Sequence, residues 1–78
     1  MKYEADYFCT AVRPEKDGAF RWVVFGYFDG GSRAGLEITS TAEYSSDAEA
    51  HMAATEWVHA NLPNASVYGD AKYKSRQA

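Results

Sequence analysis

Residues 19–28 read Ala-Phe-Arg-Trp-Val-Val-Phe-Gly-Tyr-Phe, and this stretch decides the fold of the chain. Aromatic and β-branched residues dominate it, a composition that favours a β-strand. Successive side chains of a strand point to opposite faces of the sheet. Both faces of this strand are apolar, one with Phe20, Trp22, Val24 and Phe28 and the other with Val23, Phe25 and Tyr27. We therefore expect a strand here with apolar side chains on both faces.

The segments on either side of residues 19–28 predict two more strands. Residues 3–12 are rich in tyrosine, phenylalanine, threonine and valine, which favour a strand. Residues 13–18 contain a proline and an Asp-Gly pair and predict a chain reversal. A glycine-rich turn over residues 29–33 leads to a third strand over residues 34–41. These short connections predict an antiparallel meander.

A helix is predicted over residues 46–62. Ser46 and Glu49 have the spacing of a capping box, and Asp47 adds negative charge to the first turn, where the helix dipole favours it. Pro63 ends the helix because it disfavours helical geometry at the residue before it. At 100° per residue, one face holds Ala50, Ala53, Ala54, Trp57 and Ala60. This stripe of small residues predicts close packing on the sheet, with the tryptophan as the one large anchor.

The order of these elements defines the expected fold class. Residues 65–73 follow the helix as a fourth strand, the least regular of the four. The order β-β-β-α-β predicts an α+β fold over residues 1–78, with a three- or four-stranded antiparallel sheet and one helix packed on one face. A single helix covers one face, so some apolar residues should point outward, from the set Phe8, Val12, Val23, Phe25 and Tyr27. Such residues are either scattered surface side chains or a patch that contacts a second copy or another protein.

Composition and short motifs give no enzyme signature and predict no metal, cofactor or membrane segment. The apolar runs are only a few residues long, and the first residues lack a secretory signal, so we expect a cytoplasmic protein. His51 and His59 stand two helical turns apart with no third ligand near them, so we expect a solvated helix face. Cys9, the single cysteine, lies mid-strand without a cationic neighbour in sequence and is expected to be buried and inert.

Charge is unevenly distributed along the chain, whose net charge is −3. Residues 34–71 contain six acidic residues and no lysine or arginine. The acidic residues that we expect to contact a partner are Glu43, Asp47, Glu49 and Glu56. Solvation and the helix dipole account for part of this pattern. The alternative is an electrostatic docking surface, because an uncompensated acidic surface attracts basic proteins.

The C-terminal residues predict a different partner. Lys72, Lys74 and Arg76 alternate with Tyr73, so three cations and an aromatic ring could line the last strand and bind nucleic acid. The pI of about 5.2 and the acidic region argue against this alternative, because they repel a phosphate backbone.

The element order over residues 3–73 and the acidic helix resemble several small β-β-β-α proteins of phages and mobile elements, including some anti-CRISPR inhibitors. The resemblance implies a protein that blocks a binding surface instead of catalysing a reaction, and it transfers no residue role. We therefore expect a non-enzymatic inhibitor or adaptor that occludes a basic surface of a nucleic-acid-handling protein. The sheet face around Phe25 and Tyr27 is a second candidate surface, for a partner or for a homodimer.

Overall fold

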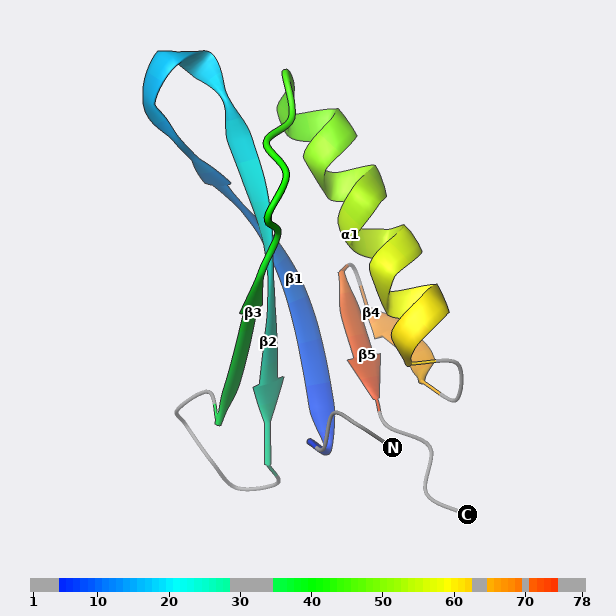
Figure 1. Ribbon diagram of the computed structural model, residues 1–78. Coiled ribbons are helices and arrows are strands. Elements are labelled where there is room, and N and C mark those ends of the chain that lie inside the picture. Colours follow the sequence, from blue (N-terminus) through cyan, green and yellow to red (C-terminus); the bar gives the residue numbers. More distant parts are fainter. Residues whose placement is uncertain (1–4, 29–34, 63–64, 70, 75–78) are drawn as a thin grey trace.

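The computed structural model describes residues 5–28, 35–62, 65–69 and 71–74. One antiparallel sheet has the strand order β3-β2-β1-β5-β4, and one helix, α1 (Asp47–Asn61), packs on one of its faces (Figure 1). The expected α+β class is confirmed. The sheet has five strands, whereas the sequence predicted three or four. The turn predicted over residues 29–33 and Arg76 lie outside the described residues.

A long hairpin forms the centre of the sheet. β1 (Tyr7–Pro14) pairs with β2 (Phe20–Tyr27) over their full lengths, and the predicted alternation of β2 side chains is confirmed by this register. The reversal between them is a short 3₁₀ turn at Lys16–Gly18, in which Asp17 and Gly18 have φ of 63° and 73°. Asp and Gly tolerate this left-handed conformation better than other residues, which explains why the Asp-Gly pair marks the turn.

The segment after the helix differs from the single strand predicted over residues 65–73. It forms a hairpin of β4 (Ser66–Gly69) and β5 (Lys72–Lys74), with a register shift between Val67 and Gly69. Ala71 has a φ of 55°, a conformation that alanine rarely adopts, so its identity gave no sign of a turn. β5 pairs with β1, whereas β3 (Leu36–Thr39) pairs with the opposite side of the hairpin, along β2.

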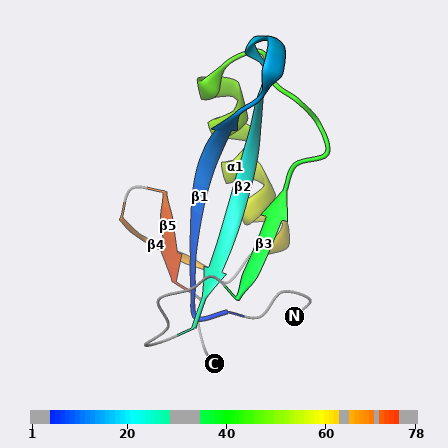
Figure 2. The ribbon, with the colours of Figure 1, turned by 90° about the vertical axis from the view of Figure 1, so that its left-hand side faces the viewer.

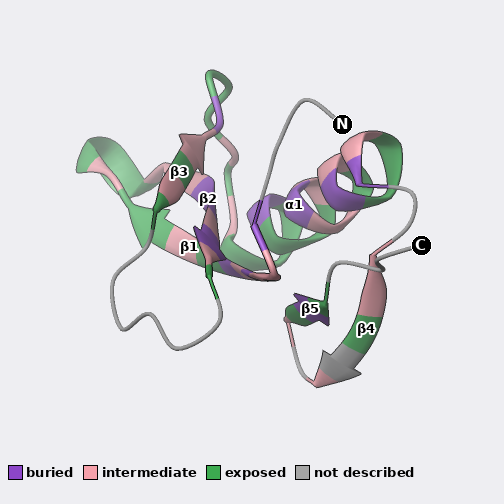
Figure 3. Ribbon diagram, turned by 90° about the horizontal axis from the view of Figure 1, so that it is seen from below, coloured by how far each residue is buried: buried purple, intermediate pink, exposed green. Residues whose placement is uncertain are grey.

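The core lies between α1 and the helix-facing side of β1 and β2 (Figure 3). It is built from Ala5, Phe8, Trp22, Val24, Ala54, Val58, Leu62 and Tyr73. The predicted helix stripe is correct for Ala50 and Ala54, which are fully buried, and wrong for Ala60, which is exposed. The inward face continues from these two alanines to Val58 and Leu62, at intervals of four residues. Trp57 is only partly buried and packs at its edge, with its ring centroid 5.6 Å from that of Trp22.

The start of α1 confirms half of the predicted capping box. Ser46 Oγ accepts a hydrogen bond from the backbone N–H of Glu49 at 3.1 Å. The Glu49 carboxylate accepts a hydrogen bond from the Ser45 hydroxyl at 2.9 Å. The first turn of the helix is therefore held by a serine cap and a second serine beside it.

Replacing Ser46 with alanine should lower the free energy of unfolding by about 1 kcal/mol, because one N–H of the first turn loses its acceptor. Urea denaturation followed by circular dichroism measures this change. The matched control is Ser45→Ala, which removes a hydroxyl from an exposed contact and should change stability by about 0.5 kcal/mol or less. Equal effects of the two substitutions would show that the cap does not stabilise α1.

Candidate partner-binding site

Arg21 organises the chain between β3 and α1. Its Nη1 donates hydrogen bonds to the carbonyl oxygens of Ser40 and Thr41, at 2.7 and 2.9 Å. Its Nε donates to Glu15 Oε1 at 3.0 Å, and its Nη2 lies 3.5 Å from Glu43 Oε2. A guanidinium is suited to this role because its donors are fixed in one plane. The connection to the helix is therefore anchored to β2.

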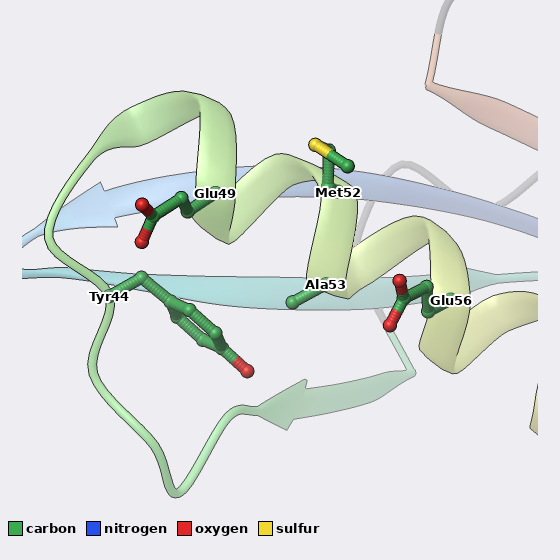
Figure 4. A pocket seen from close by; sticks show the side chains of 5 residues that line it. All are labelled: Tyr44, Glu49, Met52, Ala53 and Glu56. Carbon is green, nitrogen blue, oxygen red and sulfur yellow. The ribbon is translucent and has the colours of Figure 1, made fainter.

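This anchoring places Tyr44 beside the helix. The backbones of Tyr44 and Phe20 exchange two hydrogen bonds, at 2.8 and 2.9 Å, as an isolated bridge next to the sheet. The Tyr44 side chain packs against the core, on the side of α1 that carries Ala53 (Figure 4). Tyr44 thus forms one wall of a surface hollow, and α1 forms the other.

The hollow has a volume of about 280 Å³, is open to solvent and is lined by Tyr44, Glu49, Met52, Ala53 and Glu56. The four helical residues stand at positions i, i+3, i+4 and i+7, which lie on one side of a helix. Met52 is a large apolar side chain that is 64% exposed. The hollow therefore combines an apolar floor with a carboxylate at each end.

The two carboxylates of the hollow have no cationic partner among the residues that the structure describes. Glu49 and Glu56 are both exposed, and neither forms a salt bridge with any residue in the described part of the chain. Seven residues of helix separate their Cα atoms by about 10 Å along the axis. This spacing leaves room for a cationic group between them, above Met52 and Ala53.

The four acidic residues expected at a partner surface have different surroundings. Glu49 and Glu56 are brought together in the hollow. Asp47 is exposed in the first turn of α1 and does not line it. Glu43 is paired with Arg21, which also pairs with Glu15, so its charge is partly compensated. The acidic site is thus smaller than the sequence predicted.

The hollow also contains residues that sequence analysis missed. Met52 stands three residues after Glu49, so the helical period would have found it. Tyr44 lines the hollow from outside the helix, and Arg21, which does not line it, holds the chain that leads to Tyr44. Their roles depend on the pairing of β2 with the chain that precedes α1, which no local pattern reveals.

Phe25 and Tyr27 lie on the face of the sheet opposite α1, which we call the open face (Figure 2). Both are partly exposed, as is Tyr7, which pairs with Tyr27. Of the apolar residues expected to point outward, Val23, Phe25 and Tyr27 do so, whereas Phe8 and Val12 point toward the helix. Val23 is nevertheless only 1% exposed.

The basic strand differs from its predicted arrangement at Tyr73. This residue is 6% exposed and belongs to the core, so its ring is not available beside the lysines. Lys72 and Lys74 point to the open face, because they pair with Cys9 and Tyr7. The aromatic neighbour of Lys74 on this face is Tyr7 of β1, whose ring centroid lies 6.0 Å from Lys74 Nζ.

Tyr27 titrates unusually late for a tyrosine. Burial raises its pKa above the ordinary 10.0, and the charge of Cys9 and a hydrogen bond with it raise the pKa further. The folded state then retains a proton that the unfolded chain releases above pH 10. The stability linked to Tyr27 is full below pH 10 and is lost as the pH rises through the raised pKa.

The free energy of unfolding should therefore fall more steeply above pH 10 in the wild type than in Tyr27→Phe, which has no phenol to ionise at this position. Urea denaturation at a series of alkaline pH values measures both slopes. Tyr27→Phe should also remove one step above pH 10 from the absorbance titration of tyrosinate. Parallel slopes for the two proteins would contradict a raised pKa at Tyr27.

The remaining reactive side chains are dispersed. Cys9 is partly exposed on the open face, so the expectation of a buried cysteine is wrong. His51 and His59 are both exposed on α1. Across residues 5–28, 35–62, 65–69 and 71–74, no three His, Cys, Asp or Glu side chains are grouped to hold a metal ion.

Comparisons with protein-family models, with curated proteins and with solved structures find no match to this chain. Within the described residues, no helix combines the length and the hydrophobicity required to cross a membrane.

Proposed function

We propose that the protein is a non-enzymatic binding module that docks on a basic surface of another protein through the hollow beside α1. It would act in the cytoplasm as an inhibitor or adaptor, covering the surface that a nucleic-acid-handling partner uses for its substrate. The observation that carries the proposal is the pair of unneutralised carboxylates, Glu49 and Glu56, on either side of the exposed Met52.

The chemistry of the hollow suits an arginine or lysine side chain of the partner. The methylene stem of such a residue would pack on Met52 and Ala53, since long cationic side chains bury their stems and keep their charge near water. The cationic group would then reach a carboxylate, and the ring of Tyr44 offers an aromatic neighbour for it. Arginine fits best, because its planar group binds carboxylates through two parallel hydrogen bonds.

Occlusion of a basic groove requires negative charge that the protein does not neutralise itself. Asp47, Glu49 and Glu56 contribute this charge from one helix, and Glu43 contributes less, because it is paired with Arg21. Charge complementarity of this kind accelerates association and makes binding sensitive to salt. Charge complementarity would also underlie the anti-CRISPR-like mode of action that the resemblance suggests.

The test is a triple neutralisation, Asp47→Asn, Glu49→Gln and Glu56→Gln. Wild-type protein and variant are immobilised, and nuclease-treated host lysate is passed over both at low and at high salt. A partner of the proposed kind is retained by the wild type at low salt and lost by the variant. The purified partner should then bind the variant at least about threefold more weakly, since exposed ion pairs contribute about 0.2–1 kcal/mol each.

The matched control neutralises the same number of carboxylates off the helix, by Glu15→Gln, Asp17→Asn and Glu37→Gln. Two of these residues are paired with arginines and the third lies in the hairpin turn. The control should retain the partner like the wild type. Equal loss in both variants would indicate a response to net charge alone, and retention by the helix variant would rule out the hollow as the binding site.

A further inference from the structure

The register of the strands gathers aromatic and basic side chains on the open face of the sheet, and the proposed function does not use them. Residues directly opposite one another on paired strands point to the same face. The register of β5, β1 and β2 thus places two adjacent rows there, Lys74-Tyr7-Tyr27 and Lys72-Cys9-Phe25. Across these three strands each row runs from a lysine to an aromatic ring, and Glu37 of β3 stands opposite Phe25 at the far end of the second row.

The two lysines are available to a ligand. Lys72 and Lys74 are exposed, and neither forms a salt bridge with a described residue. Lys74 Nζ lies 6.0 Å from the centroid of the Tyr7 ring, so one cation already stands over an aromatic side chain. Among the described residues of these rows, the acidic side chain is Glu37, which stands on β3 opposite Phe25 and is held by Arg13 at 3.4 Å. Within the described part of the chain, the β5 end of the open face is therefore positive although the chain is acidic.

We propose that the open face binds a short single-stranded nucleic acid, with bases stacked on Tyr7, Tyr27 and Phe25 and phosphates beside Lys72 and Lys74. Neighbouring rows of one face are about 7 Å apart, a distance that one nucleotide of an extended strand spans. Any base can stack on an aromatic side chain, because every base has a π-face. A duplex hides these faces, so the ligand is single-stranded.

The acidic character of the chain does not oppose this ligand. The exposed carboxylates of α1 point away from the sheet, on the side opposite the open face. A helix with its side chains is about 10 Å thick, and charges are screened over about 8 Å at physiological salt. A strand on the open face therefore interacts mainly with the charges of that face, which include Lys72, Lys74 and the Arg13–Glu37 pair.

Charge complementarity also favours a nucleic acid over a second copy of the chain on this face. A twofold dimer through this face would bury Lys72 and Lys74 of both copies in one interface, and burying a charge without a partner is costly. Phosphates supply the opposite charge, and this inference does not depend on the acidic hollow.

The experiment measures fluorescence anisotropy of labelled oligothymidine and oligouridine, each about 8 nucleotides long, with a duplex of the same length as comparison. We expect the single strands to bind and the duplex to bind more weakly. Replacing both lysines, Lys72→Ala and Lys74→Ala, should reduce the slope of log K against log salt by about 1.4, since each contact with a single-stranded phosphate contributes about 0.7.

The stacking contribution is tested by Tyr27→Leu and Phe25→Leu, which keep apolar volume and remove the rings. Each should weaken binding about fivefold or more. Phe20→Leu is the matched control, because Phe20 is a partly buried aromatic residue of the same strand that points to the other face. Lys16→Ala, in the exposed hairpin turn, controls for the loss of a lysine. Both controls should bind like the wild type.

Cys9 provides an independent readout, because it is the single cysteine and lies between Lys72 and Phe25. Bound oligonucleotide should slow its alkylation by a maleimide. The proposal is overturned if no single strand binds at about 50 mM salt, if the duplex binds equally well, or if the variants bind like the wild type. It is also overturned if light scattering shows a dimer that Tyr27→Leu dissociates while oligonucleotide leaves Cys9 unprotected.

Discussion

Replacing Phe8 with alanine should lower the free energy of unfolding by about 3–5 kcal/mol. Phe8 is 1% exposed and is the largest of the fully buried side chains. It lies on the helix-facing side of β1, and its loss leaves a cavity that the surrounding side chains fill only in part. At about 0.05–0.15 kcal/mol per residue, a chain of 78 residues has a total stability of about 4–12 kcal/mol.

Urea denaturation followed by circular dichroism measures this loss, and a large fraction of the variant should be unfolded before urea is added if the wild type is at the low end of that range. The matched control is Phe28→Ala. Phe28 follows β2 and is 51% exposed, so its truncation should cost much less. Similar costs for the two substitutions would mean that the core does not lie between α1 and β1.

Replacing Ala54 with leucine should lower the free energy of unfolding by about 1–3 kcal/mol. Ala54 has no exposed surface and faces the sheet, where a longer side chain would push α1 away from β1 and β2. Helix propensity does not account for this loss of stability, because it differs little between alanine and leucine. The measurement is again the midpoint and slope of urea denaturation.

Ala60→Leu is the control for this prediction, because Ala60 is on the same helix and is exposed. It should change stability by about 0.5 kcal/mol or less. Sequence periodicity placed both alanines on the buried stripe, so the pair distinguishes the observed orientation of α1 from the predicted one. Equal destabilisation by both substitutions would support the predicted orientation.

The two proposed surfaces lie on opposite sides of the sheet and can be tested separately. The hollow belongs to α1 and the chain before it, whereas the open face belongs to β1, β2 and β5. Neutralising the helix carboxylates should leave oligonucleotide binding on the open face intact. Removing Lys72 and Lys74 should leave the binding of a basic protein partner intact. Failure of one proposal therefore leaves the other standing.

Local patterns were sufficient for the elements with strong internal periodicity. The alternation in β2 predicted which side chains share each face, and the register with β1 confirms it. Ser46 and the first-turn acids predicted the start of α1 to the residue. These features depend on neighbours in sequence, namely side-chain alternation, capping and turn chemistry.

The candidate sites were less accessible to such patterns. Tyr73 was grouped with the lysines beside it, but alternation along β5 places its ring in the core and the lysines on the open face. Arg21 looked like a polar residue of a strand, yet it holds the chain before α1 and one of the predicted acids, Glu43. Both outcomes result from contacts between segments far apart in the chain.

The amino-acid pattern alone therefore specified an α+β domain, its central strand, its helix and a concentration of acidic residues on that helix. Only the tertiary structure decided which strands lie side by side. In it, β5 lies beside β1 and brings Lys72 and Lys74 next to Tyr7. Folding likewise formed the hollow by bringing Tyr44 beside α1. Alternation, capping and turns are properties of adjacent residues, whereas strand order and surface composition depend on which distant segments bury apolar area together.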